Sequence, residues 1–297
     1  MRARGNFVAM TYRGRFAPSP TGSLHFGSLV AAVGSWLCAR HAGGRWLVRM
    51  EDLDPPREVP GSAQAILAAL PAFGLVADEP MLFQSQRTLA YDAAFERLRA
   101  ANQVFPCWCS RSDLLATGGM HRDGLCIAAP DASRAPAWRL RVPDADVVFY
   151  DALQGPQRYN LRETAGDFVI RRVEGLYAYQ LACVVDDAFQ HISAVVRGSD
   201  LLDSTPRQIW LQQCLGLPTP AYAHLPLALD ADGRKLSKSG QAHPIDPSDP
   251  MPALRRALAF LDIPVTRSAS RPAELLTEAL SAFDPAALPR RCSRRAG

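Results

Sequence analysis

Apolar and polar residues alternate with two different periods along the first hundred residues. The stretch RGRFAPS reads as a short strand that ends in a Pro-rich loop, and RWLVRMED alternates like a strand and ends in acids. Longer apolar stretches with helical spacing separate and follow these strands. The pattern predicts strands over residues 13–19 and 45–52 and helices over residues 25–41, 63–75 and 89–101. Strands that alternate with helices in this way favour a parallel sheet.

The pattern changes between residues 104 and 143, where Cys, Gly and Pro residues are crowded, and this segment is predicted to be an insertion. Strand-like apolar runs return after it. The run LACVV, which begins at Leu181, is typical of a strand that is covered on both faces. We expect strands over residues 167–172, 181–189 and 192–202 and helices over residues 205–216, 252–261 and 272–283.

The composition is that of a globular protein without a membrane anchor. Of the 297 residues, 48% are hydrophobic and 21% are charged, and no apolar run approaches the roughly 20 residues that span a bilayer. The first ten residues are too short and not apolar enough for a signal peptide. Seven scattered cysteines, an odd number, argue against a disulfide framework and for a reducing compartment, so a cytoplasmic protein is expected.

Positive charge is concentrated at the end of the chain. The formal net charge is +4, and the stretch 255–297 accounts for it with eight arginines and four acids. Arg290, Arg291, Arg294 and Arg295 form a basic tail. Such a tail suits an anionic partner such as nucleic acid, or it is simply a solvated end of the chain.

The predicted helix over residues 25–41 begins with His25 and Gly27. A helix that starts after a strand and a loop presents free N–H groups, and a glycine lets an anion approach them closely. The histidine can donate a hydrogen bond to a phosphate oxygen. Taken alone, His-x-Gly is weak evidence, because a histidine that only caps the helix has the same appearance.

The chain has only two lysines, Lys235 and Lys238, in the stretch RKLSKSG. Arginine supplies the positive charge elsewhere, so a site that keeps lysine is expected to need a compact point charge. Neutralisation of phosphate is the usual reason for such a requirement. Flanking glycines predict a loop, and a chance surface loop is the alternative.

The predicted insertion contains four potential metal ligands in a stretch of 20 residues: Cys107, Cys109, His121 and Cys126. Three thiolates and an imidazole are a suitable ligand set for a structural Zn²⁺, which would support folding rather than catalysis. Cys-x-Cys is tighter than the common Cys-x-x-Cys spacing. Unrelated buried thiols are therefore the alternative.

Three motifs together resemble the class I glutamyl-tRNA synthetase family: GRFAPSPTGSLHFGS, VRMEDLDPPR and KLSKS. The resemblance covers roughly residues 13–240. His25–Ser28 looks like the HIGH motif of that family, and Lys235–Ser239 looks like its KMSKS motif. The family resemblance implies that L-glutamate is activated by ATP, with Mg²⁺ accompanying the nucleotide.

The resemblance also implies roles for individual residues. His25, Gly27, Lys235 and Lys238 would be catalytic, and three of them, His25, Gly27 and Lys238, would bind ATP. Arg15 and Arg197 would hold the glutamate carboxylates, although a surface ion pair is the commoner fate of an arginine. Glu51 would hold the ammonium group. The full set of glutamate-binding residues would be Arg15, Phe16, Ala17, Pro18, Ser19, Glu51, Tyr179 and Arg197.

Within this family, the chain resembles the short paralogues, the glutamyl-queuosine tRNA(Asp) synthetases. Fewer than 60 residues follow Ser239, too few for the anticodon-binding domain of the longer enzymes. Ser28 stands where the parent motif ends in histidine, and EDLDPPREVPG and CWC also look like the paralogues. One departure is His121, near a position where the paralogues usually have a zinc-binding tyrosine. Such paralogues transfer glutamate to the queuosine of tRNA(Asp) without needing tRNA for activation.

The resemblance implies an α/β fold, a class I synthetase Rossmann-like domain with a small zinc-binding insertion, a C-terminal helical region and no anticodon-binding domain. We expect a monomer that binds ATP, L-glutamate and queuosine-containing tRNA(Asp) and does not associate with membranes. The expected parts are an N-terminal extension (1–12), the first half of the catalytic domain (13–103), the insertion (104–143), the second half of the catalytic domain (144–218) and the KLSKS loop with the helical region and basic tail (219–297).

Two rival functions remain open at this point. The first is a truncated glutamyl-tRNA synthetase that charges tRNA(Glu). The second is a catalytically silent paralogue that only binds tRNA, against which the presence of His25, Lys238, Arg15 and Arg197 argues.

Overall fold

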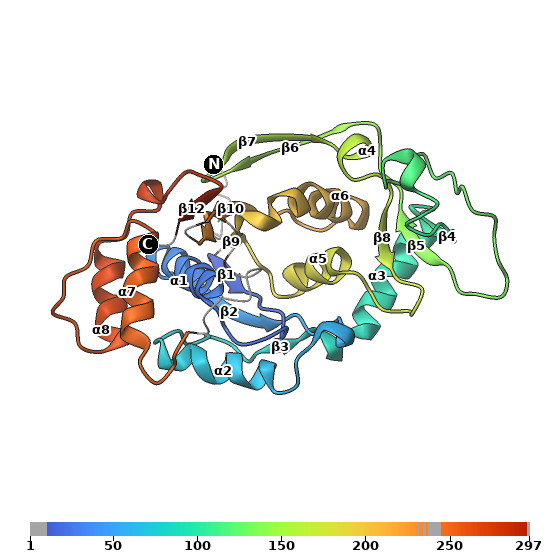
Figure 1. The fold of residues 1–297 in the computed structure, drawn as a ribbon. Helices are drawn as coiled ribbons and strands as arrows, with labels where there is room; N and C mark the ends of the chain where they lie inside the picture. Colours follow the sequence, from blue (N-terminus) through green and yellow to red (C-terminus); the bar gives the residue numbers. More distant parts are fainter. Residues whose placement is uncertain (1–10, 231, 234–235, 237–244, 296–297) are drawn as a thin grey trace, which may run out of the picture.

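The computed structural model describes residues 11–230, 232–233, 236 and 245–295. Its centre is a parallel sheet in two parts (Figure 1). The first part has the order β1–β2–β3, and the second has the order β7–β6–β10–β9, in which β6 and β7 form an antiparallel hairpin. The strands are β1 (Arg13–Phe16), β2 (Arg45–Met50), β3 (Leu82–Phe83), β6 (Asp146–Asp151), β7 (Gly155–Asn160), β9 (Ala194–Gly198) and β10 (Ala221–Leu225).

The two parts of the sheet meet at β1 and β9. Ser193, immediately before β9, donates from its backbone N–H to the carbonyl of Arg13 at 3.0 Å, and the Arg13 N–H donates to Ser193 Oγ at 2.9 Å. The pairs β1–β2, β2–β3 and β9–β10 are all parallel, which confirms the predicted parallel sheet. The strands of this sheet therefore come from two segments of the chain that lie far apart in sequence.

Helices cover this sheet and bury their apolar sides against it. In α1 (Phe26–His41), Leu29, Val33 and Leu37 are fully buried at helical spacing. Gly34 allows α1 to approach the sheet closely, because a Cβ atom there would lie 2.6 Å from Leu225 Cδ1. The other helices are α2 (Ser62–Ala72), α3 (Thr88–Ala100), α4 (Leu161–Thr164), α5 (Tyr179–Phe189), α6 (Thr205–Leu215), α7 (Pro250–Phe260) and α8 (Pro272–Ser281).

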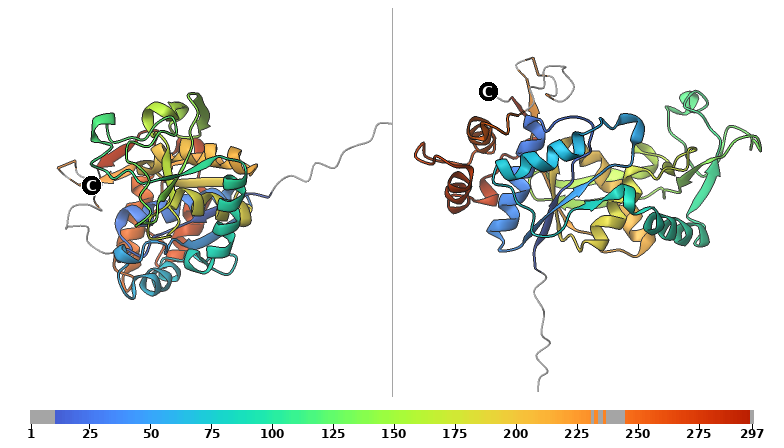
Figure 2. Two further views of the ribbon diagram at one scale, coloured as in Figure 1. Left: turned by 90° about the vertical axis from the view of Figure 1, so that its right-hand side faces the viewer. Right: turned by 90° about the horizontal axis from the view of Figure 1, so that it is seen from below.

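The predicted insertion forms an outlying part at one end of the molecule (Figure 2). It is built on an antiparallel sheet of β4 (Val104–Cys107), β5 (Ala137–Leu140) and β8 (Phe168–Arg171). The strand expected over residues 167–172 is present, but it completes this second sheet and not the parallel one. Among the described residues, no helix has both the length and the apolar character that crossing a bilayer requires.

One predicted element is wrong. Residues 181–189 were expected to form a strand, but they lie in helix α5. A short apolar run fits a helix covered on several sides as well as it fits a buried strand, so its composition does not separate the two. The β6–β7 hairpin was not predicted at all. The last described residues form a further strand, β12 (Ser293–Arg295), which pairs with β11 (Leu227–Leu229).

Candidate active site

A pocket of about 460 Å³ lies where β1 and β9 end and α1 begins. The carboxyl ends of parallel strands are the usual place for a ligand in an open α/β sheet. Leu236, which lies in the sequence between the two lysines, is part of its wall, whereas Lys235 and Lys238 themselves lie outside the described residues. All ten other predicted catalytic and glutamate-binding residues line the pocket: Arg15, Phe16, Ala17, Pro18, Ser19, His25, Gly27, Glu51, Tyr179 and Arg197.

His25 is the N-cap residue of α1. Its Nδ1 accepts a hydrogen bond from the Ser28 backbone N–H at 3.2 Å, and its Nε2 lies 3.0 Å from Ser28 Oγ. Histidine thus takes the place of the more common Ser, Thr, Asp or Asn cap. His25 therefore does cap the helix, as the alternative interpretation requires. His25 and Gly27 also line the pocket at the positive end of the helix.

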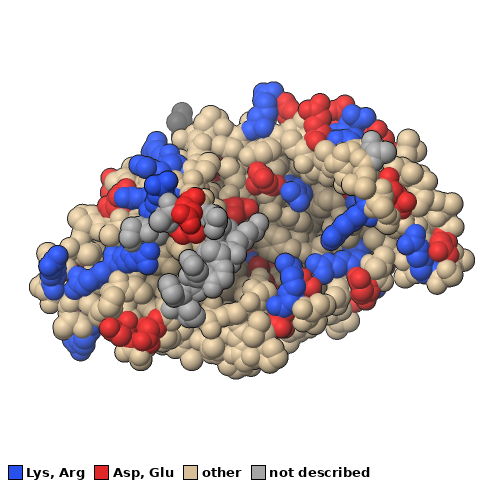
Figure 3. All heavy atoms as spheres, in the orientation of Figure 1, with Lys and Arg blue, Asp and Glu red and all other residues tan. Residues whose placement is uncertain are grey.

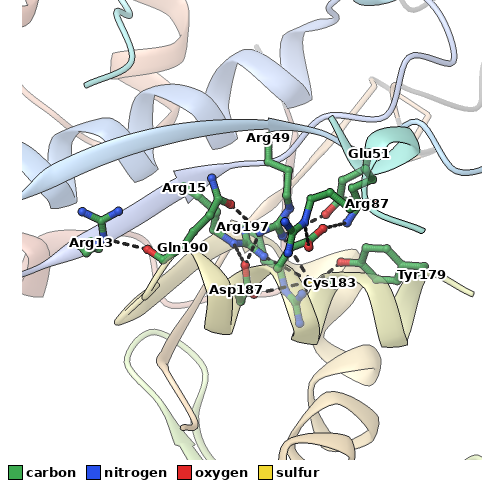
Figure 4. A network of polar contacts seen from close by, with 12 residues as sticks. Arg13, Arg15, Arg49, Glu51, Arg87, Tyr179, Cys183, Asp187, Gln190 and Arg197 are labelled. Atoms are coloured by element: carbon green, nitrogen blue, oxygen red, sulfur yellow. Dashed lines mark hydrogen bonds and ion pairs between the residues drawn. The ribbon is translucent and has the colours of Figure 1, made fainter. Parts of the chain in front are cut away.

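Arg15 is held in the pocket wall by a buried ion pair (Figure 4). Its Nε donates to Asp187 Oδ1 at 3.2 Å, and Arg49 Nη1 donates to the same oxygen at 2.7 Å. Burial raises the pKa of Asp187, but the guanidiniums of Arg15 and Arg49 outweigh this effect and lower that pKa to about 2. Asp187 is therefore ionised and is the shared counter-ion of two buried arginines.

Glu51 follows directly after β2 and lies beside the Pro-rich loop, because its backbone N–H donates to the Pro18 carbonyl at 2.9 Å. Arg49 Nη2 donates to Glu51 Oε1 at 3.2 Å. Burial raises the pKa of Glu51, and the nearby Arg49 and Arg15 only partly oppose this rise. A further cation beside Glu51 would stabilise its charged form.

Arg197, at the end of β9, is oriented by a chain of buried polar groups. Its Nε donates to His224 Nε2 at 3.0 Å, and His224 Nδ1 lies 2.5 Å from Asp151 Oδ2. Burial lowers the pKa of His224, although the Asp151 hydrogen bond opposes this effect, and a neutral imidazole is what the Arg197 hydrogen bond requires. Arg197 Nη1 donates to Tyr179 Oη at 3.2 Å, which joins two predicted pocket residues.

Sequence reasoning missed four buried polar residues around these arginines: Arg49, Asp187, His224 and Asp151. A signal was present for two of them. Arg49 interrupts the apolar strand RWLVRM, and Asp187 ends the apolar run LACVVDD, so each is a charge at a position expected to be buried. A buried charge needs a partner, and the two charges are in fact partners.

The predicted metal ligands Cys107, Cys109, His121 and Cys126 come together in the outlying part of the molecule. One ligand atom from each lies within 4.8 Å of the others. His121 Nε2 is buried and has no hydrogen-bond partner among the described residues. This arrangement fits a metal ion, because a metal would satisfy the nitrogen that is otherwise buried and unpaired.

The surroundings of the cluster favour a thiolate at Cys109 and a fixed imidazole at His121. His121 Nδ1 lies 3.0 Å from Asp167 Oδ2, which orients the ring and leaves Nε2 for a metal. The backbone N–H groups of Ile127 and Ala128 point to Cys109 Sγ at 3.2 and 3.5 Å. The four residues could therefore hold a metal ion such as zinc, with His121 as the fourth ligand.

Comparisons with known proteins agree with this geometry. A family model described as "tRNA synthetases class I (E and Q), catalytic domain" matches residues 11–248. A relative from Xanthomonas campestris pv. campestris named "Glutamyl-Q tRNA(Asp) synthetase" is 55% identical over 286 residues, which cover 95% of this chain and 95% of the relative. A protein of the same name from Burkholderia cenocepacia is 55% identical over 263 residues, covering 85% of this chain and 88% of that one.

Solved structures with a similar fold are longer enzymes. A glutamate-tRNA synthetase from Elizabethkingia anophelis superposes with a TM-score of 0.79 at 25% identity, covering 96% of this chain and 68% of that one. A glutamate tRNA ligase from Elizabethkingia meningosepticum has a TM-score of 0.79 at 24% identity, with 97% and 67% coverage. The similarity extends over nearly the whole of this chain.

Proposed function

Since the chain belongs to the family of class I tRNA synthetases for glutamate and glutamine, we propose that it activates L-glutamate with ATP and transfers it to the queuosine nucleoside of tRNA(Asp). Membership of the family confirms the resemblance seen in the three sequence motifs, and the α/β class I fold agrees with it. The finer specificity comes from the shared name of the relatives, which match over 85–95% of this chain. The main support for the proposed reaction is the pocket, in which buried arginines lie at one end and the N-terminus of α1 at the other.

Glutamate would occupy the end of the pocket that is lined by charged residues. Its two carboxylates would lie against Arg15 and Arg197, both of which are nearly completely buried and held in place by other side chains. Fixed guanidiniums lose little freedom when they bind, which favours a specific geometry. The substrate ammonium would be the further cation that stabilises ionised Glu51, with Tyr179 beside it.

ATP would lie at the other end, against the start of α1. In the reaction, a glutamate carboxylate oxygen attacks the α-phosphorus of ATP, and pyrophosphate leaves. His25, Gly27 and the first N–H groups of α1 would bind phosphate oxygens there. We assign Lys238, with Lys235, to the developing charge on the triphosphate, and Mg²⁺ would accompany the nucleotide.

The cysteine and histidine cluster would hold one structural Zn²⁺. The cluster lies in the outlying part that carries β4, β5 and β8, and not in the pocket. Cys107 is the last residue of β4, and His121 contacts Asp167, which lies just before β8. Zinc would therefore tie together the long loop between β4 and β5 and the approach to β8. Its role would be to fold this part of the protein.

An RNA partner fits the surface. On the face drawn in Figure 3, Arg side chains gather along a hollow in the middle of the molecule, towards the part that carries β4, β5 and β8. Phosphate groups favour such basic surfaces. We place the enzyme in the cytoplasm, where tRNA is found, and expect it to act as a monomer.

The deciding experiment compares the acceptance of labelled glutamate by three RNAs: queuosine-containing tRNA(Asp), tRNA(Asp) without queuosine, and tRNA(Glu). Label on the first RNA alone is the expected result. Label on tRNA(Glu) would instead identify a glutamyl-tRNA synthetase of the ordinary kind. Absence of glutamate-dependent ATP–pyrophosphate exchange would exclude catalysis altogether.

A further inference from the structure

The end of the chain returns to the active-site pocket as a strand. β12 (Ser293–Arg295) pairs in parallel with β11 (Leu227–Leu229), with Leu227 opposite Ser293 and Ala228 opposite Arg294. The Leu227 N–H donates to the Cys292 carbonyl at 2.9 Å. Leu227 and Ala228 line the pocket, so β12 supports part of its wall directly.

The same end segment also contacts the polar side of the pocket wall. The Cys292 carbonyl accepts a second hydrogen bond, from Ser199 Oγ, and Ser199 lies two residues after Arg197. Gln154 Nε2 donates to the Arg291 carbonyl at 3.3 Å and to the His224 carbonyl at 2.7 Å. The segment therefore bonds to β11, to the end of β9 and to the turn after β6.

On its other side, β12 is anchored to α7. Arg294 Nη1 donates to the Phe260 carbonyl at 2.8 Å and lies 2.6 Å from Asp262 Oδ1. Its guanidinium lies 5.7 Å from the centre of the Phe260 ring. Leu288, a few residues earlier, is buried in the main core. The end of the chain thus connects the helical region to the pocket.

We propose that β12 is a positioning element of the active site, which holds β11 and the pocket wall in the geometry that glutamate activation needs. Among the described strands, β12 is the only one paired with β11. β11 in turn holds Leu236, whose N–H donates to the Ala228 carbonyl at 3.1 Å and which lines the pocket. The matched family model ends at residue 248, so β12 lies outside that match. The inference rests on the proposed function.

The structure offers a matched pair of variants at Arg294. In a parallel ladder, one residue of a strand makes two hydrogen bonds to the partner strand. Its N–H donates to the carbonyl of one partner residue, and its carbonyl accepts from the N–H of the residue two positions later in the partner. Leu227 donates to Cys292, so its carbonyl faces the N–H of Arg294. Arg294→Pro removes that N–H together with the side chain. Arg294→Ala removes only the side chain and keeps the ladder.

The test measures glutamate-dependent ATP–pyrophosphate exchange with the full-length protein and its variants. We expect Arg294→Pro to lower kcat by about tenfold to a hundredfold, the range that a small misplacement of reacting groups produces. The glutamate KM should change less than about twofold, because Arg15 and Arg197 keep their other contacts. Arg294→Ala should stay within about threefold of the wild type in kcat.

Hydrogen exchange provides a readout that does not depend on activity. The amides of Leu227 and Leu229, which face β12 in the ladder, should exchange faster in Arg294→Pro than in Arg294→Ala. Ser199→Ala, which removes one bond to Cys292, is a milder variant in case the proline prevents folding, and it should lower kcat about two- to threefold. The inference would be overturned if folded Arg294→Pro or Ser199→Ala had the kcat of the wild type and unchanged amide hydrogen exchange at β11. A wild-type protein without glutamate-dependent ATP–pyrophosphate exchange would overturn the proposed function instead.

Discussion

Replacing Asp187 by asparagine would leave two buried guanidiniums without their shared counter-ion. The Asp187 side chain is 6% exposed, and those of Arg15 and Arg49 are 3% and 0% exposed. Removing one partner from a buried ion pair costs about 3–5 kcal/mol, because the other charge stays buried. The lowered pKa gives an independent magnitude. A shift from 3.8 to about 2 corresponds to about 2 kcal/mol at ~1.4 kcal/mol per unit.

Asp187→Asn should therefore lower the free energy of unfolding by about 3–5 kcal/mol, measured by urea unfolding near neutral pH. Asp146→Asn is the matched control, since Asp146 pairs with Arg158 on the surface at 36% and 72% exposure. It should cost below ~1 kcal/mol, because solvent screens such pairs. A loss below ~1 kcal/mol for Asp187→Asn as well would refute the shared counter-ion.

The pH dependence supplies a second check. A carboxyl whose pKa is lowered in the folded protein stabilises it above the unfolded pKa and loses this contribution as the pH falls through the folded pKa. For Asp187 this window runs from about pH 4 down to about pH 2. The difference in stability between the wild type and Asp187→Asn should shrink within that window.

Three further predictions concern the reaction, the metal and the orientation of Arg197. Lys238→Ala should lower glutamate-dependent ATP–pyrophosphate exchange by about a hundredfold or more, and near-normal exchange would remove Lys238 from the mechanism. Cys109→Ser should release zinc and lower the unfolding temperature, while metal analysis of the wild type should find one zinc per chain; a wild type without zinc would refute the cluster. His224→Ala should raise the glutamate KM about tenfold, by freeing Arg197, with a smaller change in kcat, and an unchanged KM would contradict the orienting role. Because burial lowers the pKa of His224, the wild type should also lose stability as the pH falls below about 6.5, and the variant should lose less.

Strands β1 and β2 and most helices were predictable from the sequence, because each buries one or two faces with the matching period. The strands expected over residues 13–19 and 45–52 are β1 and β2, and the helix expected over 25–41 is α1. Residues 181–189 were predicted wrongly, since their acids follow an apolar run and only tertiary contacts explain how a helix can bury them. Asp187, for instance, is buried because two arginines from other strands reach it.

The candidate site shows a similar division. Most residues that would touch the substrates lie in the three short motifs, and Tyr179 and Arg197 were assigned from the family resemblance alone. The groups that orient them are distant in sequence: Asp187 is 172 positions from Arg15, and His224 is 27 positions from Arg197. A single sequence gives no indication of such pairings, because nothing local determines which buried charge meets which. The basic end of the chain was expected to contact an anionic partner or solvent, and β12 instead pairs with β11.

The position of β1 between β2 and β9 has a consequence for how this chain folds as it is synthesised. Arg13 and Ser193 are bonded across 180 positions. At roughly 5–20 residues per second, a ribosome needs about 10 to 40 s to make the intervening chain. During this interval β2 can pair with β1 and β3 with β2, but the other edge of β1 has no partner from its own chain. An N-terminal fragment that stops before β9 would keep this edge open, and exposed strand edges promote aggregation.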